Sequence, residues 1–411
     1  MTALADTEQL TRLNALLELV AERNPFQRER LSGLPLGSLE DLRGLPATTK
    51  EELLADQAEH PPFGTNLTYE LERYTHLHQT SGTTGATLQV LNTAEDWEWW
   101  GRCLGQVYAA AGVTAADRVA LAFSFGPYVL FWASYEGVRE RGALVIPLGG
   151  MDSVQRLMTI REYAATTLLA TPTYAVHLAA VAAENGLEAA LEPVRRVICA
   201  GEPGASIPST RARIEAAWGA RCFDHAGLSE VGAFTYPCSA AGGLHLREDE
   251  FVVELLRPES CEPAEDGEPG ELVVTALSRR GFPVIRYRTG DMAARHAGPC
   301  PAGHDGGWLP HGILGRTDDM VVIRGMNVFP SAIEQILHET DGVGEFRVTF
   351  YREPAAMDEV KVEVELARAA DVRAMQARLR RRLGLRVRIV PVKQGVLVPQ
   401  AGKARRVVDL R

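Results

Sequence analysis

One short stretch of the chain combines hydroxyl side chains with glycines, as phosphate-binding loops do. It reads Thr80, Ser81, Gly82, Thr83, Thr84 and Gly85. Glycines let the backbone turn so that its N–H groups converge, and hydroxyls add further donors, so such a loop can bind an anion without a charged side chain. Ala86 stands directly after Gly85, so the stretch is not the GxxxxGK[ST] loop. Taken alone, it fits an ordinary Ser/Thr/Gly turn equally well.

Further polar residues with suitable chemistry follow along the chain. Glu230, in "FDHAGLSEVG", offers a carboxylate for the Mg²⁺ that accompanies a nucleoside triphosphate. Asp291, in "YRTGD", could accept hydrogen bonds from ribose hydroxyls, and Arg316 precedes an acidic pair in "GRTDD". Lys403 lies in the glycine-containing stretch "PQAGKARR". Each of these features is commonplace, but their joint occurrence in this order is hard to explain as chance.

In this order the chain resembles the adenylate-forming superfamily of acyl-CoA synthetases, luciferases and peptide-synthetase adenylation domains. It is most similar to the phenylacetate–CoA ligase branch, to which "RGMNVFPSAIE" (324–334) in particular points. The resemblance covers nearly the whole chain, from "LPATTKEELL" (45–54) to "GKARRVVD" (402–409). It implies an enzyme that uses ATP and Mg²⁺ to convert a carboxylic acid to an acyl-AMP, with CoA as the expected acceptor.

The resemblance also implies roles for individual residues. Lys403 and Glu230 are the expected catalytic residues: Lys403 reaches the carboxylate and the α-phosphate, and Glu230 holds Mg²⁺. Together they would neutralise the like charges of the two reactants. Asp318 is the expected hinge, about which the C-terminal domain turns between the two half-reactions. The expected nucleotide-binding residues are Thr80, Ser81, Gly82, Thr83, Thr84, Gly85, Gly201, Glu202, Pro203, Asp224, His225, Ala226, Gly227, Asp291 and Arg316.

Two alanines depart from the pattern of the family. Ala86 stands where many relatives carry Lys or Pro, and Ala226 stands where many carry Tyr. The first removes a mobile charge over the phosphates, and the second removes a ring beside the adenine or acyl pocket. Neither change touches Glu230 or Lys403, so we expect activity with a wider pocket. A catalytically silent nucleotide-binding protein is the alternative that the two alanines suggest.

The acid is expected to meet the segment "FSFGPYVLFWASYEG" (123–137), whose aromatic side chains suit an aryl or arylalkyl acid. The same rings could simply pack between a sheet and a helix. His225 could meet a polar substituent of the substrate or merely satisfy backbone groups. Transfer of the acyl group to a carrier protein or an amine, as in natural-product biosynthesis, is the alternative to CoA. The expected substrate-binding residues are Phe125, Gly126, Tyr128, Trp132, Ala200 and His225.

Two pairs of Cys and His suggest a structural zinc site. Cys238 and His245 flank a glycine-containing loop, and Cys300 and His304 flank another. Two thiolates and two imidazoles are a common tetrahedral ligand set for Zn²⁺. Some relatives in the phenylacetate branch carry a comparable set, often with a second Cys in the position of Ala302. The alternative is that these loop residues never meet.

The elements that position these residues follow from the periodicity of the apolar residues. Short apolar runs alternate with helical stretches, and the runs span 118–123, 143–150, 166–172, 195–203 and 222–227. This alternation predicts a mostly parallel, buried sheet with ligands at the carboxyl ends of its strands. From about residue 240 the apolar residues alternate every two positions, which predicts an antiparallel β subdomain.

We therefore expect an α/β protein of two domains. The first (1–317) contains the parallel sheet, flanking helices and a β subdomain at about 236–315. The second (318–411) is a small, mobile α+β domain that carries the catalytic lysine.

The overall composition excludes several other classes of protein. With 411 residues, 46% hydrophobic and 23% charged, the chain is typical of soluble globular proteins, and its net charge of −10 argues against a nucleic-acid partner. No run approaches the roughly 18 apolar residues of a membrane span, and the N-terminus has no signal-peptide pattern. The six cysteines are scattered, which suits reduced thiols or a metal site. We expect a cytoplasmic enzyme without a membrane partner, and a homodimer is one assembly that the resemblance allows.

Overall fold

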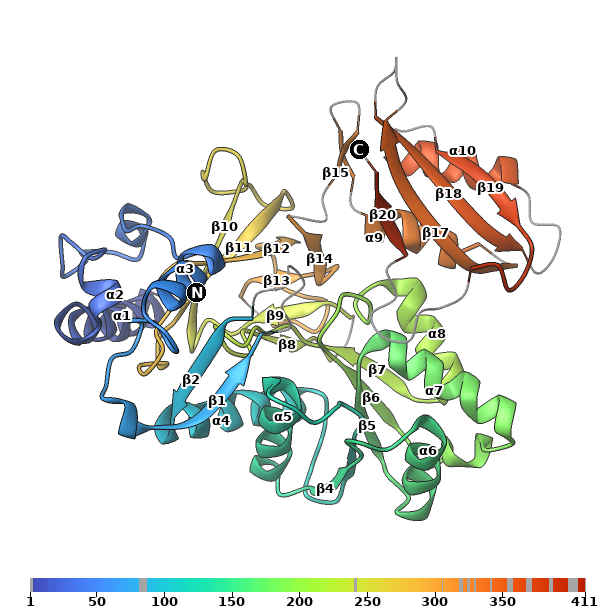
Figure 1. Ribbon diagram of the computed structural model, residues 1–411, viewed down its shortest axis with the longest axis horizontal. Helices are drawn as coiled ribbons and strands as arrows, with labels where there is room; N and C mark the ends of the chain where they lie inside the picture. The colour runs from blue at the N-terminus through green and yellow to red at the C-terminus, as the bar shows by residue number, and fades with distance from the viewer. Residues whose placement is uncertain are drawn as a thin grey trace. The chain divides into compact units, whose positions relative to one another are not determined.

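The computed structural model divides into two compact units (Figure 1). The first comprises Met1–Ser206 and Arg211–Ile313, and the second comprises Ile207–Thr210 and Leu314–Arg411. The roles expected for the two domains, and the mobility of the second, stay predictions. The structure describes residues 3–80, 87–239, 242–304, 306–317, 321–323, 326–328, 330–340, 342–352, 358–366, 372–383, 387–397 and 406–410.

A five-stranded parallel sheet forms the centre of the first unit. Its strands are β3 (Arg118–Leu121), β4 (Leu144–Pro147), β5 (Thr167–Ala170), β6 (Arg196–Cys199) and β7 (Arg221–Asp224). All neighbouring strands pair in parallel, which confirms the predicted class. The helices that follow β3, β4, β5 and β6 are α5 (Val129–Glu140), α6 (Ser153–Glu162), α7 (Pro172–Asn185) and α8 (Pro208–Trp218).

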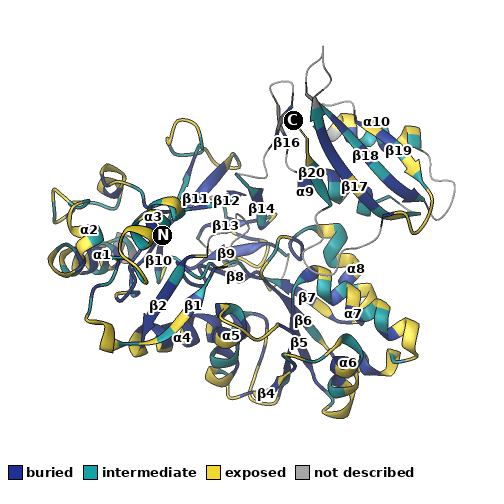
Figure 2. Ribbon diagram, in the orientation of Figure 1, coloured by how far each residue is buried: buried dark blue, intermediate teal, exposed yellow. Residues whose placement is uncertain are grey.

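Both faces of this sheet are buried, because successive side chains of a strand point to opposite faces. In β3, Val119 and Leu121 belong to the core that also contains residues of α5 and of α4 (Ala94–Ala110). Ala120 faces the opposite core, which residues of α6, α7 and α8 complete. Figure 2 accordingly shows β5, β6 and β7 mostly in the colour of buried residues. Continuous apolar runs are what this double burial requires.

The strand order β4-β3-β5-β6-β7 contains a switch point beside β3. The chain passes from β3 to β4 on one side and then returns to β5 on the other. In open α/β sheets a crevice forms at such a point, outside the carboxyl ends of the strands. The loop from β3 to α5 and the loop from β5 to α7 therefore lie on the two sides of this switch point.

Antiparallel strands complete the first unit. β1 (Tyr74–Gln79) and β2 (Gln89–Thr93) form a hairpin. The predicted β subdomain is present, with the antiparallel strands β10 (Phe251–Leu256), β11 (Pro269–Ala276) and β12 (Tyr287–Ala294). A second small sheet has the order β13-β9-β8, with β8 (Thr235–Pro237), β9 (Leu244–Leu246) and β13 (Trp308–Leu309). The boundary between the units falls within β14 (Ile313–Arg316).

Helices dominate the beginning of the chain. They are α1 (Ala3–Arg23), α2 (Pro25–Arg28) and α3 (Lys50–Glu59), with short 3₁₀ turns at Glu40–Gly44 and Leu71–Arg73. A third 3₁₀ turn, at Glu188–Ala190, lies between α7 and β6. A capping box begins α3: Thr49 accepts from the backbone of Glu52, and Glu52 accepts from the backbone of Thr49. Among the residues that the structure describes, no helix is both long and apolar enough to cross a membrane.

The second unit has the predicted α+β composition. Its main sheet has the order β19-β18-β17-β20, with β17 (Val343–Arg352), β18 (Asp358–Leu366), β19 (Arg388–Val392) and β20 (Val407–Asp409). The helices are α9 (Pro330–His338) and α10 (Val372–Leu383), and their apolar residues share one core with β17 and β18. A hairpin of β15 (Val321–Ile323) and β16 (Met326–Val328) precedes them.

Candidate active site

The loops at the carboxyl edge of the parallel sheet carry most of the residues that the sequence singles out. Phe125, Gly126 and Tyr128 lie between β3 and α5, beside the switch point. Ala200 to Pro203 directly follow β6, and Asp224 to Gly227 begin at the last residue of β7. Because parallel strands end at a common edge, residues that lie far apart in the sequence reach one side of the sheet.

Three aromatic rings, which we call the aromatic wall, pack together where α5 begins. The ring centre of Phe125 lies 4.6 Å from that of Phe131, and the ring of Trp132 lies 5.1 Å from Phe131. The Trp132 indole N–H donates to the carbonyl of Gly126 at 2.8 Å. Phe131 is buried, whereas Phe125 and Trp132 are 47% and 42% exposed. Two half-exposed rings on a buried one provide apolar surface for a ligand.

The loop after β6 is tied to the start of α7 by Glu202. Its carboxylate accepts from the backbone N–H of Thr173 at 2.8 Å and from the Thr173 hydroxyl at 2.5 Å. A carboxylate at a helix N-terminus satisfies a free N–H group and interacts favourably with the helix dipole. The side chain of Glu202 therefore acts as a helix cap, and a nucleotide contact by this residue stays a prediction.

Burial changes the acidity of the two residues at the end of β7. It raises the pKa of Asp224 to about 6, although the backbone N–H of Ser206 donates to the Asp224 carboxylate at 2.8 Å. Burial lowers the pKa of His225 to about 4, so its imidazole is neutral at pH 7. The site therefore presents a neutral ring beside a carboxylate that is easily protonated.

A tight turn from Leu228 to Gly232 holds Glu230. The backbone groups of Leu228 and Gly232 exchange two hydrogen bonds of 3.1 and 2.9 Å. Gly227 approaches this turn so closely that a Cβ there would lie 2.8 Å from the Gly232 carbonyl oxygen. Just before Gly227, the Ala226 N–H donates to the hydroxyl of Thr235 at 2.6 Å. The turn thus has little freedom to move the carboxylate of Glu230.

The Glu230 carboxylate is buried and oriented by a phenol. Only 4% of the residue is exposed, and the Tyr287 hydroxyl donates to Oε1 at 3.1 Å. A carboxylate oxygen is a ligand that Mg²⁺ prefers, and one that accepts from this phenol still keeps lone pairs for a cation. Glu230 therefore fits the role of magnesium ligand.

A fully buried arginine that sequence reasoning missed links this turn to the β1–β2 hairpin. Arg279 donates to the carbonyl of Ser229 at 2.7 Å and to Oδ1 of Asn92 at 2.8 Å. The amide of Asn92 in turn lies 3.3 Å from Nδ1 of His78. Burial lowers the pKa of Arg279 to about 10, an effect that Asp96 and Glu230 oppose, so the guanidinium stays charged at neutral pH. We call the side chains of Arg279, Asn92 and His78 the arginine bridge.

Thr80 closes the base of the predicted phosphate loop. Its N–H donates to the carbonyl of Leu88 at 3.1 Å, and its hydroxyl accepts from the N–H of Leu88 at 3.1 Å. Thr80, just after β1, and Leu88, just before β2, are therefore held side by side at the end of the hairpin. The other predicted residues Ser81, Gly82, Thr83, Thr84 and Gly85, with Ala86, Asp318 and Lys403, lie outside the described residues.

The two predicted ribose-binding residues lie in strands. Asp291 is half-buried in β12, where its N–H donates to the hydroxyl of Thr289 at 3.0 Å. Arg316 is the last residue of β14 and is also half-buried. Their roles toward a ribose stay predictions.

The arginine bridge makes the stability of the protein depend on pH. Burial, with His76 and Arg279 nearby, lowers the pKa of His78 from 6.5 to about 4. As pH falls below 6.5, the unfolded chain binds a proton that folded His78 does not accept until about pH 4, so stability is lost across this window. At pH 5 this loss amounts to about 2 kcal/mol of unfolding free energy. Urea unfolding at pH 7 and pH 5 should show a smaller decline for His78→Gln than for the native protein, and equal declines would contradict this origin.

Three of the four predicted zinc ligands come together. Cys238 follows β8, His245 lies in β9 and Cys300 precedes β13, and all three are buried. Their ligand atoms lie within 4.8 Å of one another, and the two sulfur atoms are 3.8 Å apart. Two thiolates bound to one tetrahedral zinc at ~2.3 Å would also be ~3.8 Å apart. The fourth residue, His304, is exposed, with its ring centre 5.4 Å from that of His245, and does not join this group.

The state of these side chains fits a metal. Nε2 of His245 is buried and has no hydrogen-bond partner in the described part of the chain. Burial opposes ionisation of Cys300, but the N–H groups of His304 and Ala302 and the Cys238 thiol bring its pKa below the ordinary value. A lowered pKa favours the thiolate, which is the form that binds zinc. The residues present therefore fit Zn²⁺, with His304 predicted as the fourth ligand.

If zinc is bound, the purified protein is expected to contain about one equivalent of the metal. Cys300→Ser should lower the zinc content and the melting temperature together, because metal binding to the folded state alone stabilises that state. Cys261→Ser is the matched control, since Cys261 is exposed and lies outside this group. Less than a tenth of an equivalent in the native protein, measured by elemental analysis, would contradict the site.

Known proteins share both the sequence and the fold of this chain. The family described as the AMP-binding enzyme C-terminal domain matches residues 325–411. Phenylacetate-coenzyme A ligase of Escherichia coli (strain K12) is 29% identical over 98% of this chain and 94% of its own length. The phenylacetate-coenzyme A ligase of Thermus thermophilus is also 29% identical, over 98% of this chain and 96% of its own length.

A solved structure extends this similarity to the whole fold. It is 2-hydroxyisobutyryl-CoA ligase in the postadenylation state in complex with 2-HIB-AMP, with a TM-score of 0.90 and 30% identity. The match covers 99% of this chain and 90% of that chain. The chain therefore belongs to the adenylate-forming superfamily of acid–CoA ligases, in its phenylacetate–CoA ligase-like branch.

Proposed function

We propose that this enzyme uses ATP and Mg²⁺ to convert a small aryl or arylalkyl carboxylic acid to its acyl-AMP, and then transfers the acyl group to CoA. One observation supports this most directly: the aromatic wall and the residues that follow β6 and β7 lie at one edge of a single parallel sheet. An apolar surface for the acid and a turn with a buried carboxylate for the metal are the two parts that such a reaction requires.

In the first half-reaction a carboxylate oxygen of the acid attacks the α-phosphorus of ATP. The bond from the α-phosphorus to the bridging oxygen breaks, and pyrophosphate leaves with the electron pair. Glu230 would hold Mg²⁺, which neutralises phosphate charge when bound. The loop from Thr80 to Gly85 would bind phosphate oxygens, and Lys403 would neutralise charge on the reacting oxygens.

In the second half-reaction the sulfur of CoA attacks the acyl carbon, and AMP leaves with the electrons of the broken carbon–oxygen bond. The thiol proton passes to solvent or to a base. We propose that rotation about Asp318 removes Lys403 between the two steps and admits the thiol. Zinc held by Cys238, His245 and Cys300 would stabilise the small sheet of β8, β9 and β13 and would take no part in either step.

A panel of carboxylic acids with ATP, scored for pyrophosphate release, tests this function. Release with an aryl or arylalkyl acid, followed by consumption of the acyl-AMP only when CoA is added, is the expected result. If no acid in a broad panel releases pyrophosphate, the proposed activity is wrong. If pyrophosphate is released and the acyl group then passes to an amine or a carrier protein but not to CoA, the acceptor is not CoA.

Lys403→Ala separates an active enzyme from a silent nucleotide-binding protein. Removing the charge should lower pyrophosphate release by about 10²–10³-fold, as loss of a group that stabilises transition-state charge commonly does. ATP binding, measured by calorimetry, should change much less. Unchanged pyrophosphate release in this variant would refute the role of Lys403.

A further inference from the structure

The inner face of α5 continues from the aromatic wall into the protein. Phe131, Ser134 and Val138 follow at helical spacing, and all three are buried. Because α5 begins at the carboxyl edge of the sheet and runs back along it, Ser134 lies about 4.5 Å deeper along the helix axis than Phe131. A buried hydroxyl thus lies one turn below the rings proposed to meet the acid.

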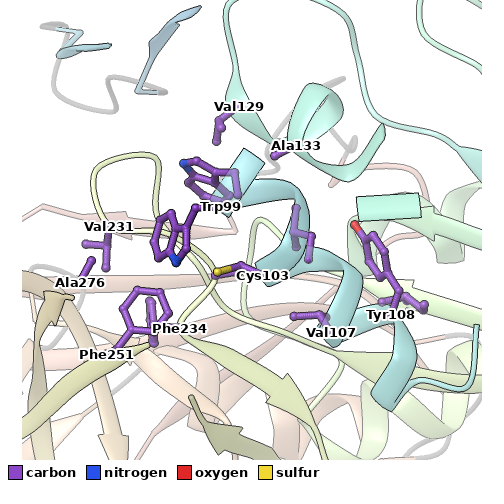
Figure 3. Close-up of a cluster of buried hydrophobic side chains, with 14 of the residues drawn as sticks. Trp99, Cys103, Val107, Tyr108, Val129, Ala133, Val231, Phe234, Phe251 and Ala276 are labelled. Atoms are coloured by element: carbon purple, nitrogen blue, oxygen red, sulfur yellow. The ribbon is translucent and has the colours of Figure 1, made fainter. Parts of the chain in front are cut away.

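Tyr108 of α4 brings a second hydroxyl to the same place. Its ring packs against α5 so closely that a Cβ on Gly137 would lie 2.9 Å from its Cε2. The Tyr108 ring also meets the ring of His225 edge-on, with ring centres 6.3 Å apart. Figure 3 shows Tyr108 at one end of the buried cluster, apart from Trp99, Phe234 and Phe251. Tyr108, Ser134 and His225 therefore converge from α4, α5 and the loop after β7, and we call them the polar floor.

Each residue of the polar floor has a buried polar atom without a partner. The Tyr108 hydroxyl, the Ser134 hydroxyl and Nδ1 of His225 make no hydrogen bond within the described ranges of the chain. Ser134 lies close enough to Tyr108 to lower the pKa of the phenol as a weak hydrogen-bond partner, but the two hydroxyls do not form a well-aligned hydrogen bond. The three residues are at most 6% exposed. Leaving such a group unpaired costs about 1–3 kcal/mol, so a ligand that supplied the missing partners would be stabilised at this place.

The polar floor is electrically neutral. Burial alone lowers the pKa of His225 to about 4, and burial raises that of Tyr108, with no contribution from a neighbouring charge in either case. At pH 7 the floor therefore offers two hydroxyls and a neutral imidazole, which can both donate and accept. An anionic substituent would lose its hydration here without gaining a counter-ion from these three residues. The floor suits an uncharged group such as a hydroxyl.

We propose that the acid pocket ends in this polar floor, and that the natural substrate is a small carboxylic acid bearing an uncharged hydrogen-bonding substituent, a hydroxyl above all, on the part remote from its reacting carboxylate. The inference rests on the proposed function, since it assumes that the aromatic wall receives the acid. It also assigns a task to His225, whose buried Nδ1 has no hydrogen-bond partner among the described residues. Tyr108 and Ser134 become residues that determine specificity.

Matched pairs of acids test the proposal. The probes are phenylacetate and benzoate, each compared with its 3- and 4-hydroxy derivatives, in which the hydroxyl is remote from the carboxylate. Pyrophosphate release with saturating ATP gives kcat/KM for each acid. We expect at least one hydroxylated acid to exceed its parent by about 10-fold or more, which corresponds to about 1.4 kcal/mol. If every parent acid equals or exceeds its hydroxylated derivatives, the polar floor does not bind substrate.

The variants Tyr108→Phe and Ser134→Ala then test which residues bind the hydroxyl substituent of the acid. Either change should reduce the preference for the hydroxylated acid about 10-fold, mainly through KM, while the parent acid keeps its rate. Tyr74→Phe is the matched control, because the Tyr74 hydroxyl is bonded to the Gly281 carbonyl at 2.6 Å, and it should leave the preference unchanged. Equal losses for both members of a pair in Tyr108→Phe and Ser134→Ala would show a purely structural role and overturn the proposal. Absence of pyrophosphate release with every acid would instead overturn the proposed function and this inference with it.

Discussion

Glu230→Gln is expected to lower pyrophosphate release by about 10²–10³-fold, the range typical for loss of one group that stabilises transition-state charge. The substitution keeps the size of the side chain but removes the negative charge that would hold Mg²⁺. The amide oxygen can still accept from Tyr287, so the turn from Leu228 to Gly232 should keep its shape. The concentration of Mg²⁺ that gives half-maximal rate should rise along with the loss of rate.

Glu254→Gln is the matched control for this variant. Glu254 is also a carboxylate with little exposure, but it pairs with Arg286 at 2.9 Å, in the β subdomain. Its replacement should reduce stability and leave the Mg²⁺ dependence unchanged. A Glu230→Gln enzyme with native Mg²⁺ dependence would remove Glu230 from the metal site. Tyr287→Phe should give a smaller loss than Glu230→Gln, because only the orientation of the carboxylate is affected.

Arg279→Met should raise the KM for ATP by about 10–100-fold, as loss of a residue that orients a metal ligand commonly does. Methionine fills a similar volume but leaves the Ser229 carbonyl and Oδ1 of Asn92 without their donor. The free energy of unfolding should fall by about 2–5 kcal/mol, because each unpaired buried acceptor costs about 1–3 kcal/mol and relief of the buried charge offsets only part of that. Steady-state kinetics with ATP varied, and urea unfolding, measure the two effects.

Arg286→Met distinguishes positioning from stability. Arg286 is similarly buried and also joins distant segments, since it binds Glu254 and the carbonyl of Leu45. The Arg286→Met variant should lose about as much unfolding free energy as Arg279→Met, while its KM for ATP stays near the native value. If Arg279→Met changes stability alone, the arginine bridge does not position the nucleotide site. Arg279→Lys, which keeps the charge but loses the planar fork of donors, should fall between the native protein and Arg279→Met.

The parallel sheet was predictable because its burial on both faces leaves a direct trace in the sequence. Runs such as 118–123 and 166–172 are apolar without alternation, and they became β3 and β5. The β1–β2 hairpin was not predicted, although it flanks the most recognisable loop in the chain. Burial alternates along β1, but the polar His78 is on the buried side and the apolar Leu77 is exposed, so the residue types do not show the two-residue period.

The sequence points to candidate site residues where a local motif carries the chemistry, and not where distant residues meet. Glu230 and the residues after β6 and β7 lie in short motifs, and the sheet topology brings them to one edge. Arg279 and Tyr108 have no such signal: an arginine usually indicates a surface, and a tyrosine within an apolar helix indicates a core. Only the fold shows that Arg279 is fully buried beside Ser229, and that the Tyr108 hydroxyl has no well-formed hydrogen bond to the described residues.

The contact between α4 and α5 limits how this enzyme can diverge. A Cβ at Gly137 would lie 2.5 Å from Cβ of Leu104, so any other residue there would push the two helices apart. The spacing of α4 and α5 sets the depth at which Tyr108 and Ser134 lie below the aromatic wall. We therefore expect a change of acid specificity to arise from single side-chain replacements on α4 and α5. A shift of either helix is much harder to accommodate. Selection for a longer or shorter substrate would act on Tyr108 and Ser134 and leave Gly137 in place.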